Sequence, residues 1–369
     1  MLVSKQEQCR SLGNLLDQPA YYRVFAGFDG FVDEVIHVVD QRQNANDYTR
    51  IKTISEYAER IAAAAGVSTN IELVPIQTKL GGNGPIYANA MARTGNDVLY
   101  VGALGEPVEA VFAPLCEVCR EVVSVANSAH TDAVEFYDGK LIISKLASLN
   151  EVTYERLLER VGREKLTREV AAADMLSFMN WTMIPHMSEI WERFMREILP
   201  GSGQSGFAFF DLADPRKRCA EHILEALELI GQMQAFRRVV LGLNLMEAKQ
   251  IGGLLGVDTS SLEALARGIS ESTGLYGVVI HPVKEACCVL GGVFARVEGP
   301  YCEKPALTTG AGDNFNAGFC NGLLRGLLPE QCLLLGTATS GYYVRQAHSP
   351  NRQELQQFLF DWGEGNLRG

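Results

Sequence analysis

The sequence has little positive charge, because 33 lysines and arginines stand against 44 aspartates and glutamates, and the net charge is −11. It has neither a basic stripe nor a lysine-rich tail, so nothing indicates a nucleic acid or a membrane surface as a partner. Long apolar runs are also absent, since charged residues and prolines interrupt the most apolar stretches well short of a membrane span. The composition predicts an ordinary globular protein.

A secretory signal and a disulfide framework are missing as well. Lys5, Glu7, Arg10 and Asp17 occur before any apolar run develops, which is unlike an export signal. The nine cysteines are an odd number and are scattered through apolar segments, which fits a reducing compartment. The sequence therefore predicts a cytoplasmic protein.

Short β-rich runs alternate with helical patterns along the whole chain, without an internal repeat or a linker. This pattern is typical of an α/β fold with a largely parallel central sheet covered by helices, and it predicts one domain over residues 1–369. The predicted strands are 23–28, 98–102, 174–179, 207–211, 239–243 and 276–280. The predicted helices are 85–94, 152–161, 188–199, 216–230, 245–255, 260–273, 314–324, 333–346 and 352–360.

Two hairpins interrupt this alternation. Residues 130–137 and 140–145 flank Asp138-Gly139, which predicts a tight primed turn, and a second hairpin surrounds Gly291-Gly292. The first hairpin, with part of the segment before residue 80, predicts a small β lid built from parts of 34–80 and 127–148. The alternative is that this hairpin only extends the main sheet.

The stretch 307–319 is a small-residue turn that carries a carboxylate and leads into an amphipathic helix. Gly310, Ala311 and Gly312 have little side chain to hold a phosphate away from their N–H groups, which would lie at the positive end of that helix. Asp313 follows at the place where a substrate hydroxyl would meet the phosphate. The arrangement favours phosphoryl transfer.

Three further turns carry polar groups. Asn244 opens the helix 245–255 with Glu247 one turn later, a pattern that a simple capping box also explains. The glycine-rich turn at Gly82 and Asn83 allows a polyhydroxy ligand to approach closely. Asp29 and Asp33 follow the first strand and offer acceptors to sugar hydroxyls, although carboxylates there also suit a solvated turn.

The order and spacing of these turns resemble the ribokinase-like, PfkB-type carbohydrate kinase family over nearly the whole chain. The segment 308–313 matches most of the family's C-terminal signature, and Gly81-Gly82 through Gly105 matches its N-terminal one. The resemblance implies a three-layer fold with a small β lid, use of ATP and Mg²⁺, and a homodimer through the lid. It implies these roles: Asp313 as catalytic base; Gly310, Ala311 and Gly312 as anion hole; Asn244, Thr308 and Thr309 at the nucleotide; Glu247 at the metal; Asp29, Asp33, Gly82 and Asn83 at the sugar.

Three positions depart from the family pattern. Leu307 replaces the first Asp of the C-terminal signature. A monovalent-cation site that depends on that carboxylate is therefore not expected to form in the same way. Ile86 replaces the Asn that usually follows the double glycine, which predicts rearranged substrate contacts. His281-Pro282-Val283 replaces a T-x-G turn that helps to hold nucleotide phosphates, and we interpret His281 as structural.

Other nucleotide-binding folds fit less well. No G-x-x-x-x-G-K-[ST] motif occurs, and Phe315 stands where a dinucleotide fold needs its third glycine. The sequence predicts a kinase that phosphorylates a hydroxyl of a small sugar, or else of a nucleoside. The competing hypothesis is a sugar- or nucleoside-binding regulatory protein on the same fold with weak catalysis.

Overall fold

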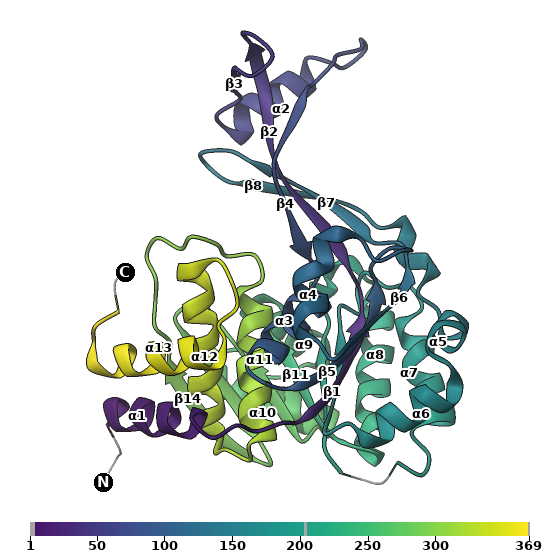
Figure 1. Cartoon of the computed structure of the whole chain (residues 1–369), viewed down its shortest axis with the longest axis vertical. Helices are drawn as coiled ribbons and strands as arrows, with labels where there is room; N and C mark the ends of the chain where they lie inside the picture. The colour runs from purple at the N-terminus through teal and green to yellow at the C-terminus, as the bar shows by residue number, and fades with distance from the viewer. Residues whose placement is uncertain (1–3, 203–204, 368–369) are drawn as a thin grey trace.

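Two β-sheets organise the chain in the computed structural model, which describes residues 4–202 and 205–367 (Figure 1). Within these residues the larger sheet has nine strands, and the run from β12 to β6 is parallel. In spatial order its strands are β14 (Val293–Glu298), β13 (Glu285–Leu290), β12 (Gly277–Ile280), β11 (Arg238–Leu243), β10 (Phe207–Asp211), β9 (Met175–Met179), β1 (Arg23–Phe28), β5 (Asp97–Ala103) and β6 (Glu121–Ala126). The predicted parallel sheet is confirmed.

Helices cover both faces of this sheet and give the predicted three layers. Each strand sends alternate side chains to opposite faces, so Phe210 packs on one side and Phe209 on the other. One face carries α5 (Tyr154–Val161), α6 (Arg163–Ala172), α7 (Met187–Arg193), α8 (Ala220–Gln232), α9 (Leu245–Leu255) and α10 (Leu262–Thr273). The other carries α1 (Lys5–Leu16), α3 (Asn83–Arg93), α4 (Ala113–Val118), α11 (Ala311–Leu324), α12 (Pro329–Gln346) and α13 (Arg352–Glu364).

Short turns of other helix types join these elements. They are η1 (Ala110–Phe112), η2 (Ala147–Glu151), η4 (Pro215–Lys217) and η5 (Met233–Ala235), and η3 (Phe194–Ile198) continues α7 as a π turn. The predicted helix 216–230 is wrong in its first turn. Arg218 is extended and donates from Nε to the carbonyl of Thr182, so α8 begins only at Ala220.

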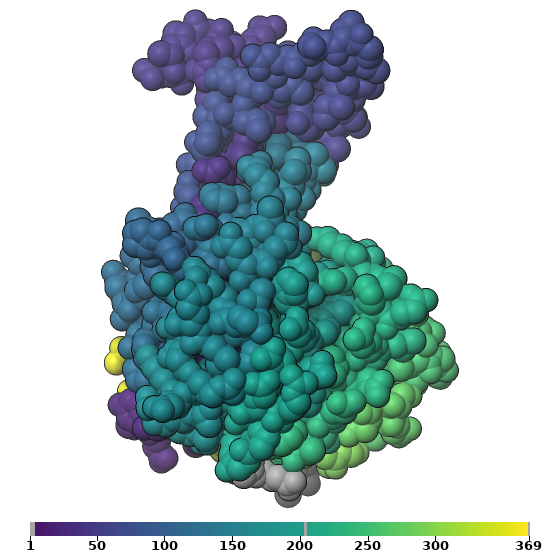
Figure 2. Space-filling model, turned by 90° about the vertical axis from the view of Figure 1, so that its right-hand side faces the viewer, coloured from purple at the N-terminus to yellow at the C-terminus, as the bar shows by residue number. Residues whose placement is uncertain are grey.

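The smaller sheet projects from the body of the molecule in both views (Figures 1 and 2). Its strands are β3 (Tyr48–Arg50), β2 (Phe31–Arg42), β7 (Ala129–Glu135), β8 (Lys140–Lys145) and β4 (Leu73–Gly81), and helix α2 (Ile54–Ala62) belongs to the same part. The predicted hairpin is therefore confirmed as β7 and β8, and it belongs to a separate sheet. Its residues occupy both predicted lid segments, although β2 already begins at Phe31.

The turn of this hairpin differs from the prediction. Glu135 pairs with Lys140, and neither Asp138 nor Gly139 has the positive φ that a primed Asp-Gly turn needs. Asp138 instead accepts a hydrogen bond from the Ile54 N–H at the start of α2. The second hairpin is as predicted, because Gly291 and Gly292 both have positive φ between β13 and β14.

No helix in the described part of the chain combines the length and apolar character needed to cross a membrane.

Candidate active site

Two cavities lie on either side of the segment that leads into α11, beyond the carboxyl ends of the parallel strands. The larger, of about 390 Å³, is lined by Thr308, Ala311 and Gly312, together with Asn244 and His281, which directly follow β11 and β12, and residues of α12. The smaller, of about 220 Å³, is lined by Thr309, Gly310 and Asp313, together with residues of the small sheet. The short segment 308–313 therefore separates the two cavities. Such an arrangement suits transfer of a group from one ligand to another.

Gly310 is the residue on which this segment turns. Its φ is 92°, in the left-handed region that glycine favours, and it is the N-cap of α11. The helix consequently starts three residues earlier than predicted, at Ala311. Its first intrahelical bond runs from the Asn314 N–H to the Gly310 carbonyl.

The predicted three-amide anion hole is wrong in one of its members. The Ala311 N–H already donates to the Thr308 carbonyl at 3.1 Å, so it is not free for a ligand. For the N–H groups of Gly312 and Asp313 the described residues supply no acceptor. These two amides lie in the first turn of α11, at the positive end of the helix dipole.

Asp313 is buried, with 6% of its surface exposed, at the boundary of the smaller cavity. One carboxylate oxygen accepts a hydrogen bond of 2.9 Å from the Asn83 side-chain amide. Burial, with a smaller contribution from the neighbouring Asp211, raises the pKa of Asp313 well above its usual range. A carboxylate with a raised pKa is a stronger base, which suits proton abstraction from a hydroxyl.

Asp29 does not line either cavity, although the resemblance predicted that it contacts the sugar. It is completely buried, and its two oxygens accept the N–H groups of Asn83 and Gly84 at 2.9 and 2.8 Å. The Asn180 side chain adds a third hydrogen bond of 2.7 Å. Burial raises the pKa of Asp29 to about 6 despite these donors. Asp29 thus fixes the start of α3, and through it the Asn83 side chain that contacts Asp313.

The other predicted sugar residues do line the smaller cavity. Asp33 reaches it from β2, and Gly82 and Asn83 reach it from the turn that opens α3. Gly82 has a φ of 95°, so this turn also needs glycine. Thr309 faces this cavity as well, whereas Thr308 faces the larger one.

Asn244 and Glu247 form the capping box that was the simpler explanation of their spacing. The Asn244 side chain accepts the N–H groups of Met246 and Glu247, and Glu247 accepts the Asn244 N–H at 2.8 Å. The other Glu247 oxygen accepts the Asp214 N–H at 2.9 Å. Burial raises the pKa of Glu247, although the N–H groups of Asp214 and Asn244 act in the opposite direction.

Asp211 is a carboxylate of the site that the sequence analysis missed. It ends β10 and accepts hydrogen bonds from the Ala213 N–H and the Asn316 side chain. Burial, followed by the nearby Glu247, raises the pKa of Asp211 to about 8. The sequence feature that could have identified Asp211 is its position at the carboxyl end of a predicted parallel strand, where ligands of such sheets bind.

His281 lies in the larger cavity, where its ring packs on Phe315 with centroids 4.8 Å apart. Burial lowers the pKa of His281 to about 4, so the ring is neutral near pH 7. Asn244 also borders this cavity, and the remaining wall is largely proline, glycine and apolar side chains.

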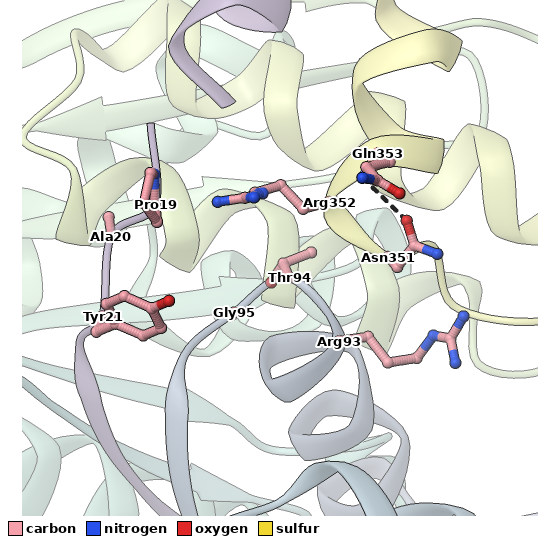
Figure 3. Close-up of a pocket in the computed structure, with 9 residues that line it drawn as sticks. All are labelled: Pro19, Ala20, Tyr21, Arg93, Thr94, Gly95, Asn351, Arg352 and Gln353. Carbon is pink, nitrogen blue, oxygen red and sulfur yellow. Dashed lines mark hydrogen bonds between the residues drawn. The ribbon is translucent and has the colours of Figure 1, made fainter. Parts of the chain in front are cut away.

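A depression of about 300 Å³ near the start of α13 shares no lining residue with either site cavity (Figure 3). Arg93 and Arg352 border it, but their side chains extend in opposite directions. Arg93 donates to the Ser349 carbonyl at 2.7 Å and is engaged within the protein. This depression adds nothing to the site.

Comparisons with known proteins show the family and the fold. The chain is similar to the ketohexokinase of Haloferax volcanii, with 30% identity over 345 residues, 91% of this chain and 90% of that protein. Its fold is that of a Sinorhizobium meliloti adenosine kinase (TM-score 0.65, 18% identity, 92% of this chain, 98% of that one). It is also that of a Thermotoga maritima ribokinase (TM-score 0.60, 19% identity, 91% and 98%).

A family model, described as prokaryotic ketohexokinase, matches residues 5–362. This match spans both sheets, both cavities and the segment 308–313. The chain therefore belongs to the prokaryotic ketohexokinase family, and it is a ribokinase-like carbohydrate kinase.

Proposed function

We propose that this kinase transfers the terminal phosphoryl group of ATP to a hydroxyl of a ketohexose. The observation that carries the proposal is the position of Asp313, between a cavity large enough for a nucleotide and a smaller one lined with polar groups. ATP would occupy the larger cavity and the sugar the smaller. The similarity to a protein named ketohexokinase supports a ketohexose over other small sugars.

In the proposed reaction, Asp313 accepts the proton of the attacking hydroxyl as the oxygen–phosphorus bond forms and the bond to ADP breaks. Asn83 holds the carboxylate toward the sugar through its 2.9 Å hydrogen bond. The N–H groups of Gly312 and Asp313 stabilise negative charge on the transferred group. Gly310 allows the tight turn that brings base and amides together. Asp33, Gly82 and Asn83 contact the sugar, and Thr308 and Asn244 border the nucleotide.

The acidic residues fit a magnesium ion bound through water. Among the described residues no three His, Cys, Asp or Glu side chains approach closely enough to form a direct metal cage. Asp211 and Glu247 are buried, the charge of Glu247 raises the pKa of Asp211, and each carboxylate oxygen keeps a lone pair beyond the bond it accepts. Mg²⁺ usually keeps several waters and needs few carboxylates. When bound with ATP, it would neutralise phosphate charge; Glu247 and Asp211 would hold it.

The small sheet would act as a lid within a single domain. Its strands β2, β4, β7 and β8 contribute residues to the wall of the smaller cavity. Exclusion of water there protects ATP from hydrolysis. Ile142 on β8 lines this cavity, whereas its neighbour Ile143 points to the opposite face of the sheet and is 47% exposed, which favours a homodimer that pairs two lids through that face.

The decisive experiment follows ADP release by Asp313→Asn over a panel of ketohexoses, aldohexoses and nucleosides. We expect an unchanged fold and ATP affinity and a loss of several orders of magnitude in kcat. Asp258→Asn, which alters an exposed carboxylate between α9 and α10, serves as the control. Unchanged turnover would remove Asp313 from the reaction. Tight sugar binding without ADP release by the native protein would favour the regulatory alternative.

A further inference from the structure

Lys79 on β4 is a half-buried lysine that lines the smaller cavity. Within the described residues its ammonium group makes no hydrogen bond and no ion pair. Loss of solvent lowers the pKa of Lys79, the charge of Lys140 lowers it further, and the carboxylates of Asp33 and Glu135 offset these effects only in part. A half-buried charge without a partner is costly, so a ligand that supplies the missing acceptors is the natural explanation.

The backbone explains why Lys79 does not pair with Asp33. The two residues are directly opposite each other on β4 and β2. The Asp33 carboxylate, however, lies over Gly81, where an added Cβ would come within 2.2 Å of its Cγ. Glycine at 81 thus gives Asp33 room to lean away from Lys79 along the sheet. The ammonium remains available to the cavity.

The charges around the cavity favour a neutral ligand. Lys140 also lines it, and this lysine is held by Glu135 at 2.8 Å. Two carboxylates, on Asp33 and Asp313, face the same space. A substrate with its own carboxylate or phosphate in this cavity would meet both of these acids. A polyhydroxy compound, in contrast, can accept from the lysine and donate to the carboxylates.

We infer that Lys79 is a specificity-determining residue that donates hydrogen bonds to hydroxyl oxygens of an uncharged sugar. The inference rests on the proposed function, because it assigns the sugar to the smaller cavity. Lys79 comes from the small sheet while Asn83 and Asp313 come from the body, so the sugar is held from both sides. A lysine that served only to balance Asp33 would affect stability and not sugar affinity.

The test compares Lys79→Met, Lys79→Arg and Lys145→Met. Lys145 lies on β8 of the same sheet, is 65% exposed and pairs with Asp132 outside the cavity lining, so it is a matched control. Methionine keeps the length of the lysine stem without the charge, whereas arginine keeps the charge. The measurements are KM for D-fructose, KM for ATP, kcat, and the shift in melting temperature that fructose causes without nucleotide.

For Lys79→Met we expect the KM for fructose to rise about 10- to 150-fold, the range set by hydrogen bonds to a charged group, with little change in the KM for ATP. The fructose-induced melting shift should disappear. Lys79→Arg should recover part of the affinity, and Lys145→Met should behave as the native enzyme. A fructose KM within twofold of native for Lys79→Met would overturn the inference.

The acid 2-keto-D-gluconate separates the remaining explanations. The native enzyme should use it far less well than fructose. A preference for this acid that Lys79→Met abolishes would assign Lys79 to a carboxylate and refute the neutral-sugar inference. If the native enzyme phosphorylates no sugar at all, the proposed function fails. The fructose-induced melting shift of the native and Lys79→Met proteins then still decides whether Lys79 binds sugar.

Discussion

Gly310→Ala perturbs the turn that leads into Asp313, the proposed base, and into the N–H groups of Gly312 and Asp313. Two costs follow from the structure. Alanine at a φ of 92° pays about 1–2 kcal/mol for the left-handed conformation. Its Cβ would also lie 2.7 Å from the Tyr343 hydroxyl, which donates to the Thr309 carbonyl at 2.8 Å. Displacing that hydrogen bond costs about 1 kcal/mol more. We expect a total loss of about 2–3 kcal/mol in the free energy of unfolding.

Gly326→Ala is the matched control for this change. Gly326 follows the other end of α11, has a φ of 67°, and an added Cβ there meets no atom within 4 Å. It should therefore show the backbone cost alone, about 1–2 kcal/mol. Urea denaturation gives the free energy of unfolding of both variants. We expect Gly310→Ala to be less stable than Gly326→Ala by about 1 kcal/mol, which is the cost of crowding at Tyr343.

Activity is the second measurement on these variants. Movement of Thr309 shifts the segment that leads into Asp313, and misplacement of a reacting group by about 1 Å can cost ~100-fold in rate. We expect kcat of Gly310→Ala to fall at least about tenfold, and kcat of Gly326→Ala to stay within twofold of native. Equal stabilities and equal rates for the two variants would refute the argument that the 308–313 turn positions the base.

Three further changes test individual contacts. Asn83→Ala removes the hydrogen bond to Asp313 and should lower kcat by about tenfold or more in an ADP-release assay, while the KM for ATP stays constant. Glu247→Gln keeps one acceptor oxygen, enough for the Asn244 N–H of the capping box, but loses the acceptor for the Asp214 N–H, and it should raise severalfold the Mg²⁺ concentration for half-maximal activity. An unchanged Mg²⁺ requirement would leave Glu247 a capping role alone. The pKa of His281 is about 4 when folded and ~6.5 when unfolded, so its contribution to stability is complete above about pH 6.5 and is lost as the pH falls toward 4. His281→Phe, which keeps the ring on Phe315, should flatten this loss in denaturation curves recorded from pH 7 to 4.

The larger sheet was largely predictable because its signals are local. β1, β10 and α9 begin and end at the predicted residues, since short apolar runs and the capping box at Asn244 define them without help from distant residues. The segment 310–313 could be recognised as a candidate site for the same reason. Its glycines and carboxylate are adjacent in sequence, and their chemistry is informative by itself.

The small sheet was predictable only in part because its pairings join distant residues. β2 pairs with β4 and with β7, which come about 40 and 100 residues later, and no local pattern specifies that register. The proposed role of Lys79 could not be predicted for the same reason, because it depends on the position of the Asp33 carboxylate over Gly81. A tertiary contact also moved the hairpin turn, since Asp138 accepts from the Ile54 N–H. The hydrogen bond from the Ala311 N–H to the Thr308 carbonyl could be recognised only from the geometry of the whole turn.

One of the connections between the two sheets, from β1 to β2, has a mechanical consequence. Only Asp29 and Gly30 separate the end of β1 from the start of β2, and Asp29 is bonded to the first N–H groups of α3. We therefore expect any tilt of the small sheet to move Asp29, and with it the start of α3 that carries Asn83. If the small sheet is the lid and Asp313 the base, as proposed, sugar binding would also align the base, and we expect the enzyme to hydrolyse little ATP when no sugar is bound.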